Sequence, residues 1–578
     1  MCGDFHYTHI TALPMKSSIL RHFSRRSSSK PFYCTTPIFY VNASPHLGHL
    51  YSMLLADTRV RWEKLKKGQK SYFLTGTDEH GLKIQGVAEK QNVEPKALVD
   101  SVSQNFKHMA RKMKIDYSRF IRTTDDDHVE AVKHFWNVMM RKGLIYKGIH
   151  DGWYSVSDEA FYTEAQIEEV SDGSGGARRV SKETGSEVVY QEEENYFFRL
   201  SAFQDRLIQY IEENHTLIQP QHKMKQVLEE LKSEPLKDLS VSRHTSRLQW
   251  GIEVPNDPTQ KVYVWFDALL NYLTAAGYPH RDLKAPNNIW PACHVLGKDI
   301  MRFHCIYWPI FLMAAEIDLP KMIFVHSHWL CDGKKMSKSI GNVVDPYLMA
   351  DYYGVDPLRF FLMEQSNINT DSNFSEDALF NHRGMLLNKF ANLTSRVCAP
   401  KFEIAEGLRQ ANTGVFNDID SLLLADTVTS TDKKRTIELR NELVVAIDSL
   451  KEEMDAPLQQ FDHMKALKSW WNVVELINGF FQATEPWAYN KFVEAEKERA
   501  IRNYLVYVAT EGIRVTTLCI QPYMPDLSAA ILDRLAVSKD KRALDYAKLG
   551  GDPDYGTGSN RQHKDKLMQK IEPRTENL

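Results

Sequence analysis

Short apolar runs, rich in β-branched and aromatic residues, alternate with amphipathic stretches from Pro31 to about residue 375. Such runs predict buried strands, and their alternation with helical patterns predicts an α/β domain with a doubly wound parallel sheet. The predicted strands are residues 32–36, 71–75, 262–266, 294–296 and 323–326. After about residue 376, long amphipathic patterns without strands predict an α-helical bundle.

The strand pattern is interrupted between about residues 150 and 260, where the sequence becomes polar and rich in Glu, Gly and Ser. We interpret this segment as an insertion that splits the sheet domain. The last residues have little apolar content, which predicts a flexible or surface-draped tail. The predicted units are residues 1–30 (leader), 31–150 and 261–345 (the two halves of the sheet domain), 151–260 (insertion), 346–375 (linking region), 376–540 (bundle) and 541–578 (tail).

The N-terminal leader, residues 1–30, contains five basic residues against the single acid Asp4, with serines and scattered apolar residues. This composition is typical of a mitochondrial transit peptide and predicts import into the mitochondrial matrix. The alternative is a disordered basic arm, because such arms are common at chain termini.

Composition limits which partners are expected, namely nucleic acid, structural metal or membrane. The chain has 72 basic and 75 acidic residues, a formal net charge of −3, so a nucleic-acid partner needs a local basic surface. The seven cysteines contain no Cys-x-x-Cys pair, which predicts a reducing compartment and no structural zinc. The longest apolar run, residues 305–315, is shorter than the roughly 18–20 residues of a membrane-spanning helix, so we expect no membrane contact.

Two histidines follow the first predicted strand in the sequence Pro45-His46-Leu47-Gly48-His49, and an apolar stripe at helical spacing begins there. They therefore lie at a strand-to-helix turn. The free N–H groups and the positive dipole end of a helix favour phosphate, and Gly48 allows a nucleotide to approach the backbone. His46 and His49 can donate to phosphate oxygens. The alternative is that both are capping or core histidines.

A second motif, Lys335-Met336-Ser337-Lys338-Ser339, lies in a glycine-flanked loop nearly 290 residues later. Lys334, Lys335 and Lys338 can place ammonium charges on the β- and γ-phosphates while charge develops at the α-phosphate. A lysine-rich loop that is simply solvated is the alternative.

Together, the two motifs resemble the paired signatures of class I aminoacyl-tRNA synthetases, in which both motifs close around ATP and no covalent enzyme intermediate forms. The resemblance implies a Rossmann-like catalytic domain, ATP accompanied by Mg²⁺, and catalysis by positioning and electrostatics. The implied catalytic residues are His46, His49, Lys335 and Lys338. The implied ATP-binding residues are His46, Gly48, His49, Gly297, Asp299, Lys335 and Lys338.

Four stretches, residues 35–42, 75–81, 264–272 and 297–304, are similar to the methionyl branch of that class. This similarity implies activation of L-methionine with ATP and transfer to the 3′ end of tRNA(Met). Asp78 would accept hydrogen bonds from the α-ammonium. The implied side-chain pocket consists of Ile38, Tyr40, Trp265, Ala268, Leu269, Tyr272, Ile300 and His304. Aromatic edges suit a polarizable thioether, although buried aromatic residues are also ordinary core.

The insertion spans only about 110 residues, too few for the large editing domain of the isoleucyl, valyl and leucyl branches. Methionyl enzymes often carry zinc-binding cysteine knuckles here, but the matching residues 153–159 contain no cysteine. We therefore expect a metal-free knuckle that is stabilised by packing.

In the helical region, Leu386, Phe390, Leu393 and Val397 form one apolar stripe, and Lys389, Asn392 and Arg396 fall on a different face. By the resemblance, Asn392, Arg396 and Trp487 correspond to readers of the CAU anticodon. Such residue types suit recognition of splayed RNA bases. The alternative is a solvated helix face and a core tryptophan.

Two other functions are open. A small-molecule adenylyltransferase or ligase of the same fold would use both ATP motifs, but the helical region of about 160 residues argues against it. A non-catalytic RNA-binding protein would not need intact His46, His49, Lys335, Lys338 and Asp78. A monomer is favoured, because no dimerisation domain is evident after the bundle.

Overall fold

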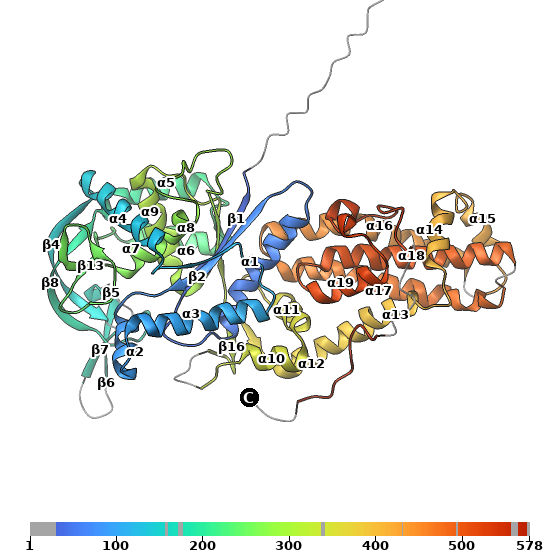
Figure 1. Ribbon diagram of the computed structural model, residues 1–578, viewed down its shortest axis with the longest axis horizontal. Helices are drawn as coiled ribbons and strands as arrows, with labels where there is room; N and C mark the ends of the chain where they lie inside the picture. Colours follow the sequence, from blue (N-terminus) through green and yellow to red (C-terminus); the bar gives the residue numbers. More distant parts are fainter. Residues whose placement is uncertain are drawn as a thin grey trace, which may run out of the picture.

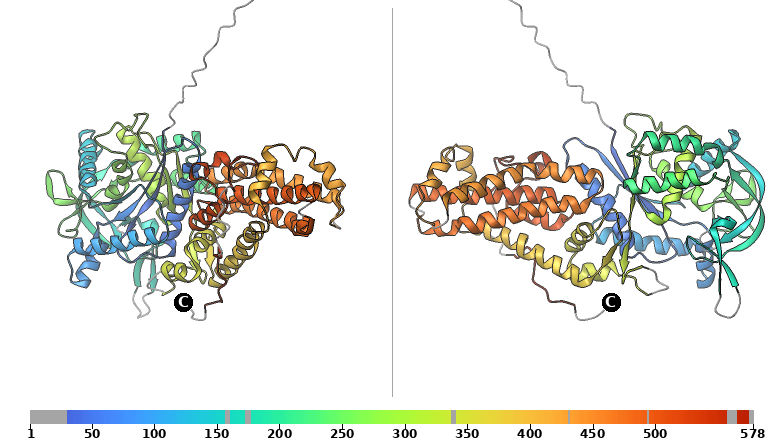
Figure 2. Two further views of the ribbon diagram at one scale, coloured as in Figure 1. Left: turned by 45° about the vertical axis from the view of Figure 1, so that its right-hand side comes forward. Right: turned by 180° about the vertical axis from the view of Figure 1, so that it is seen from behind.

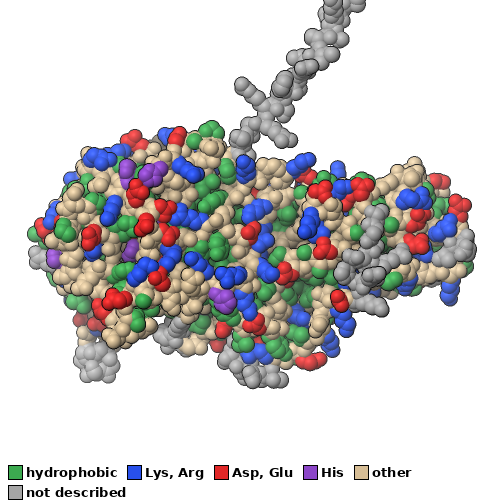
Figure 3. Space-filling model, in the orientation of Figure 1, with side chains coloured by type: hydrophobic (Ala, Val, Ile, Leu, Met, Phe, Trp, Pro, Cys, Tyr) green, Lys and Arg blue, Asp and Glu red, His purple; other side chains and the backbone are tan. Residues whose placement is uncertain are grey.

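The computed structural model describes residues 30–155, 160–171, 177–336, 341–429, 432–492, 495–556 and 565–574. The molecule is elongated, with the sheet domain at one end and the helical bundle at the other (Figures 1 and 2). Basic and acidic side chains are interspersed over the face shown in Figure 3. Among the described residues, no helix is both long enough and apolar enough to cross a membrane.

A six-stranded parallel sheet in the order β3-β2-β1-β14-β15-β9 forms the core of the first domain. Its central strands are nearly continuous apolar runs because helices cover both faces. The strands are β1 (Phe32–Tyr40), β2 (Ser71–Asp78), β3 (Arg119–Arg122), β9 (Ile218–Gln219), β14 (Cys293–Gly297) and β15 (Met322–His326). The flanking helices are α1 (Leu47–Leu65), α2 (Leu82–Gln91), α3 (Pro95–Lys112), α4 (Asp126–Arg141), α5 (Gln204–Glu213), α6 (Gln221–Ser233), α7 (Val264–Leu269), α8 (Asn271–Ala275) and α9 (Trp308–Ala315).

One predicted strand is wrong. Residues 262–266 do not form a strand, because β13 (Asp257–Val262) ends there and α7 begins at Val264. Val264 and Phe266 are buried, and burial favours apolar residues in a short helix as much as in a strand. Periodicity cannot separate a short buried helix from a short buried strand.

The boundary of the predicted insertion also differs from the structure. β9 lies within residues 151–260 but pairs with β15 as the edge strand of the central sheet. A strand of two residues is too short to be recognised in a sequence. The insertion proper is antiparallel, with a sheet in the order β10-β8-β4-β5, a β6–β7 hairpin and a sheet in the order β11-β13-β12. Its strands are β4 (Ile145–Ser155), β5 (Ala160–Tyr162), β6 (Ile167–Ser171), β7 (Ala177–Ser181), β8 (Val189–Phe198), β10 (Leu239–Ser240), β11 (Ser242–His244), β12 (Glu253–Val254) and β13.

A linking region of two helices and a small sheet joins the sheet domain to the bundle. It consists of β16 (Trp329–Cys331), β17 (Lys334–Lys335), α10 (Pro346–Tyr353), α11 (Val355–Glu364) and β18 (Ser372–Phe374). The bundle consists of α12 (Glu376–Met385), α13 (Asn392–Val397), α14 (Ile404–Asn412), α15 (Ile419–Leu424), α16 (Lys433–Gln459), α17 (His463–Thr484), α18 (Glu496–Ile520) and α19 (Pro525–Arg534). The predicted apolar stripe of Leu386, Phe390, Leu393 and Val397 is fully buried.

The described parts of the C-terminal tail are packed on the rest of the chain. Tyr555 is 1% exposed beside α18. Further on, the Arg574 guanidinium donates to both carboxylate oxygens of Glu376, at 2.7 and 3.1 Å. The chain end therefore returns to the start of α12.

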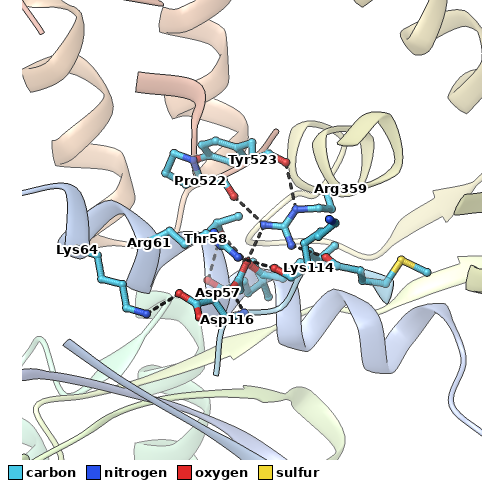
Figure 4. A network of polar contacts seen from close by, with 12 residues as sticks. Asp57, Thr58, Arg61, Lys64, Lys114, Asp116, Arg359, Pro522 and Tyr523 are labelled. Carbon is cyan, nitrogen blue, oxygen red and sulfur yellow. Dashed lines mark hydrogen bonds and ion pairs between the residues drawn. The ribbon is translucent and has the colours of Figure 1, made fainter. Parts of the chain in front are cut away.

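A buried ion pair joins the two domains (Figure 4). Arg359 on α11 donates to Asp57 on α1 at 2.6 Å, and both side chains are almost completely buried. The same guanidinium donates to the carbonyl oxygens of Met113, Pro522 and Tyr523. Helix α1, which starts at the histidine motif, is thus fixed to the turn between α18 and α19.

His463, at the same junction, makes the stability of the protein sensitive to acid. Burial and the charge of Arg59 lower its pKa to about 3, below the value near 6.5 that it has when unfolded. The unfolded chain therefore binds a proton first, and stability is lost as the pH falls below 6.5. Between pH 6.5 and 4.5, the unfolding free energy should therefore fall by about 2 kcal/mol less in His463→Asn than in the unmodified protein. Urea unfolding at both values measures this, and an unchanged pH dependence contradicts the assignment.

Candidate active site

A cleft of about 1760 Å³ lies beyond the carboxyl ends of the central strands. In open α/β sheets, this edge is where ligands bind. The cleft exceeds the roughly 300–1,000 Å³ of ordinary small-molecule sites, so it has room for a nucleotide and a second substrate. It is lined by eleven of the predicted site residues, namely Ile38, Tyr40, His46, Gly48, His49, Asp78, Trp265, Gly297, Asp299, Ile300 and Lys335.

The two motif histidines cap the N-terminus of α1. The ring Nδ1 of His46 accepts from the Gly48 N–H at 3.1 Å, and the ring Nδ1 of His49 accepts from the His46 N–H at 3.1 Å. Because Nδ1 is the acceptor in both rings, the proton of each neutral ring is on Nε2. A Cβ on Gly48 would lie 2.9 Å from His46 Cε1, so a larger residue here would displace the His46 ring. The motif can offer two ring N–H donors beside a helix N-terminus.

Lys335, Asp299 and His328 form a second polar group in the lining of the cleft. Lys335 Nζ lies 3.0 Å from Asp299 Oδ2, and His328 Nε2 lies 3.3 Å from Asp299 Oδ1. Desolvation raises the pKa of Asp299, but the His328 hydrogen bond and the Lys335 charge outweigh it and hold the pKa well below its usual range. A Cβ on Gly297 would lie 2.7 Å from Asp299 Oδ1, which explains the glycine. A carboxylate and an ammonium are therefore paired at the cleft wall.

Asp78 ends β2 and is 6% exposed. Its neighbour Glu79 is fixed by Arg122, which donates to both carboxylate oxygens at 2.6 and 2.9 Å. The turn that carries Asp78 is thus rigidly held. A carboxylate at this position can bind an ammonium group.

The predicted side-chain pocket is only partly exposed to the cleft. Ile38, Tyr40, Trp265 and Ile300 line it, and the Trp265 ring stacks on Phe303 at 3.7 Å. Ala268, Leu269, Tyr272 and His304 are each at most 3% exposed and lie behind this lining.

His304 lies beneath Trp265 as a neutral polar group. Its Nε2 lies 2.7 Å from the Tyr272 hydroxyl, and the two rings of His304 and Trp265 are perpendicular at 6.1 Å. Burial lowers the pKa of His304 to about 4. The imidazole is therefore uncharged near neutral pH, which suits a pocket for an uncharged side chain.

Some residues of the cleft escaped the sequence prediction. Ser52, one turn after His49, bonds His326 Nε2 at 2.9 Å and so ties α1 to the end of β15. The residue types alone gave no signal for this contact. Lys338 lies outside the described residues, as do the leader residues 1–29 and residues 156–159 of the knuckle.

The described knuckle residues are held by ring contacts. The Arg179 guanidinium lies 4.3 Å from the Trp153 ring, and Tyr190 packs edge-on at 5.4 Å. Within the part of the chain that the structure describes, no three His, Cys, Asp or Glu side chains are arranged to hold a metal.

The three predicted anticodon readers lie in the bundle, far along the chain from the cleft residues. Arg396 is exposed, lies over the Phe481 ring at 5.8 Å and donates to Asn478 Oδ1 at 3.1 Å. Half-buried Trp487 packs on the other side of the cluster, 5.7 Å from Phe481. Asn392 is exposed one helical turn before Arg396. Phe481 and Asn478 were missed, because they follow an ordinary amphipathic pattern on α17.

Residues 32–398 match the family model of class I tRNA synthetases of the methionyl type (M). The chain belongs to this family. It is 52% identical to the mitochondrial methionine–tRNA ligase of Candida albicans, over 95% of this chain and 97% of that protein. It is 41% identical to the Saccharomyces cerevisiae mitochondrial enzyme, over 95% and 97%. The human mitochondrial enzyme is 40% identical, over 89% and 85%.

Among solved structures, the chain is similar to a methionyl-tRNA synthetase of Mycobacterium tuberculosis in complex with methionyl-adenylate. The TM-score is 0.78 and the identity 36%, over 90% of this chain and 96% of that one. The predicted family, the aminoacyl-tRNA ligase class and the split α/β domain followed by a helical domain are confirmed.

Proposed function

We propose that the protein is a mitochondrial methionine–tRNA ligase that forms methionyl-adenylate in the cleft and transfers methionine to the 3′ end of tRNA(Met). The observation that carries this proposal is the meeting of the histidine motif, Asp78, Trp265 and Lys335 in one cleft. A small-molecule ligase would also need such a cleft. It would not need the Arg396–Phe481–Trp487 cluster in a separate helical domain, where Arg396 is exposed.

In the first step, a methionine carboxylate oxygen attacks the α-phosphorus of ATP, and pyrophosphate leaves. Asp78 would hold the α-ammonium, and the pocket beside Trp265 would hold the thioether. His46 and His49 donate N–H groups to the phosphates at the helix N-terminus. Lys335 and Lys338 would stabilise the charge that develops on the leaving pyrophosphate. No side chain needs to act as nucleophile, so the protein contributes placement and charge.

Binding of ATP requires Lys335 and Asp299 to share their contacts with the nucleotide. Gly297 leaves room for the Asp299 carboxylate, because a Cβ there would lie 2.7 Å from Asp299 Oδ1. Mg²⁺ would arrive with the triphosphate, since this ion keeps several waters and binds phosphate oxygens more than protein cages. The protein would act as a monomer in the mitochondrial matrix.

Methionine-dependent exchange of pyrophosphate into ATP, measured with and without tRNA, tests the proposal. We expect exchange without tRNA and methionylation when tRNA(Met) is added. A chain that exchanges pyrophosphate but charges no tRNA is a small-molecule ligase. A chain that binds tRNA(Met) without exchange is a non-catalytic RNA-binding protein.

Replacing Trp487 by alanine is expected to lower kcat/KM for tRNA(Met) by roughly 5- to 150-fold, because stacking on one base contributes about 1–3 kcal/mol. Exchange without tRNA is expected to be unchanged. Trp471→Ala is the matched control, because Trp471 is also a half-buried bundle tryptophan but bonds Glu364.

Aminoacylation of a tRNA with an altered anticodon distinguishes base reading from general damage. That tRNA already lacks the base contacts, so Trp487→Ala should leave its slow charging nearly unchanged. Equal losses on both tRNAs, or a loss that Trp471→Ala reproduces, contradict anticodon reading by Trp487.

A further inference from the structure

A buried carboxylate behind the cleft is held by two histidines from distant parts of the chain. Asp267 Oδ2 lies 2.7 Å from His80 Nδ1, and Asp267 Oδ1 lies 2.7 Å from His128 Nε2. The side chains of Asp267 and His128 are 1% and 0% exposed. Asp267 does not line the cleft, so the proposed chemistry does not use it directly.

The three residues come from three separate elements. His80 follows β2 in the turn that carries Asp78, Asp267 lies on α7, and His128 lies on α4. Helix α7 is the first element after the insertion. As a helix, it takes no part in the hydrogen bonds that join the parallel strands of the sheet. Its placement against β2 therefore depends on side-chain contacts.

Burial raises the pKa of Asp267, but the two histidines outweigh this effect and lower it below its ordinary value. The carboxylate is therefore an anion that accepts one hydrogen bond on each oxygen. Burying a charged group costs free energy unless well-placed hydrogen bonds replace nearly all of its bonds to water. We call this arrangement, Asp267 with His80 on one oxygen and His128 on the other, the Asp267 fork. Because both hydrogen bonds must be kept, the fork restrains both the distance of α7 from its neighbours and its rotation about its own axis.

The rotation of α7 decides which side chains face the cleft. Trp265 and Asp267 are two residues apart and therefore lie on different faces of the helix. Trp265 lines the cleft while Asp267 points into the domain. The Asp267 fork thus fixes the wall that carries Trp265 relative to the turn that carries Asp78.

The turn is fixed from the same side. The His80 ring packs against Trp250 at 5.6 Å, and Trp250 Nε1 donates to the Glu79 carbonyl oxygen at 2.5 Å. The Gly81 N–H donates to the Trp250 carbonyl oxygen at 3.1 Å. His80 is therefore a rigid anchor and not a mobile ligand of Asp267.

We propose that His80, Asp267 and His128 are positioning residues that set the separation between Asp78 and the Trp265 wall, and so select an amino acid with a side chain of methionine's length. This inference rests on the proposed function, in which Asp78 holds the ammonium group and Trp265 the thioether. A side chain longer by one methylene, as in ethionine, then reaches the wall too early. Discrimination of one methylene in a pocket amounts to roughly 10- to 200-fold.

Asp267→Asn tests the proposal, because the amide keeps the shape but presents an NH₂ group to one of the two histidines. We expect the methionine KM in pyrophosphate exchange to rise at least roughly 10-fold. The ATP KM and the kcat at saturating methionine should stay within about twofold, because the histidine motif is untouched. The preference for methionine over ethionine in kcat/KM should fall roughly 10-fold.

Glu511→Gln is the matched control, because Glu511 and Arg514 form an equally buried pair within α18, at 2.7 Å. This variant should lose stability without any change in the methionine KM or in the ethionine ratio. The proposal is overturned if Asp267→Asn resembles it, with a lower melting temperature but unchanged KM and ratio. If Asp267→Asn does not fold, His128→Asn, which removes one of the two bonds, must show the same shifts. Absence of methionine-dependent exchange in the unmodified protein contradicts the proposed function instead.

Discussion

Replacing His49 by alanine is expected to lower kcat for methionine-dependent pyrophosphate exchange by about 100- to 1,000-fold, the usual effect of losing one donor to a developing charge. The His49 ring packs edge-on against Phe39 and Phe106, at 5.2 and 5.3 Å, and its Nδ1 accepts from the His46 backbone N–H. The donor is therefore placed before ATP arrives. The methionine KM should change little, because His49 lies at the helix N-terminus and not beside Asp78 or Trp265.

Steady-state exchange with each substrate varied in turn measures this effect. His108→Ala is a suitable control, because His108 is an exposed histidine that stacks on Tyr347. A raised methionine KM with normal kcat would place His49 in amino-acid binding and contradict its role at the phosphates.

Replacing Arg359 by methionine is expected to destabilise the protein by about 3–5 kcal/mol, because Asp57 is left as a buried charge without its main partner. Figure 4 shows the contacts that would be lost. Arg359 donates to Asp57 and to three backbone carbonyl groups from both domains. Arg61 also bonds the same Asp57 oxygen, at 2.8 Å, but its own side chain is partly exposed.

Urea unfolding followed by circular dichroism measures this loss. Arg409→Met is the control, because Arg409 and Glu406 form a surface pair whose loss should cost less than about 1 kcal/mol. The double variant Asp57→Asn with Arg359→Met should regain part of the stability, since no charge is then left buried. Equal losses for Arg359→Met and Arg409→Met would show that the junction does not depend on this pair.

Features set by neighbouring residues could be predicted from the sequence, whereas contacts between residues far apart in the sequence could not. The strands at residues 32–36, 71–75, 294–296 and 323–326 were recognisable because each is a buried run between helical patterns. The run at 262–266 was misassigned, because burial gives a short helix the same composition. The cleft residues next to Gly48 and Gly297 could be predicted from motifs. The bonds of Asp267 to His80 and His128, and the Ser52–His326 bond, could not be predicted, because partners 139 or more residues apart leave no local pattern.

The pairing of β1 with β14 has a consequence for the order of folding. Cys34 lies opposite Cys293, so the inner edge of β1 has no partner until about 260 more residues have been synthesised. At 5–20 residues per second, that interval is roughly 13–50 s. An apolar strand with an open edge is prone to aggregate during such a delay. The segment that carries β1 is therefore the part of the nascent chain that most needs protection from aggregation until β14 has been synthesised.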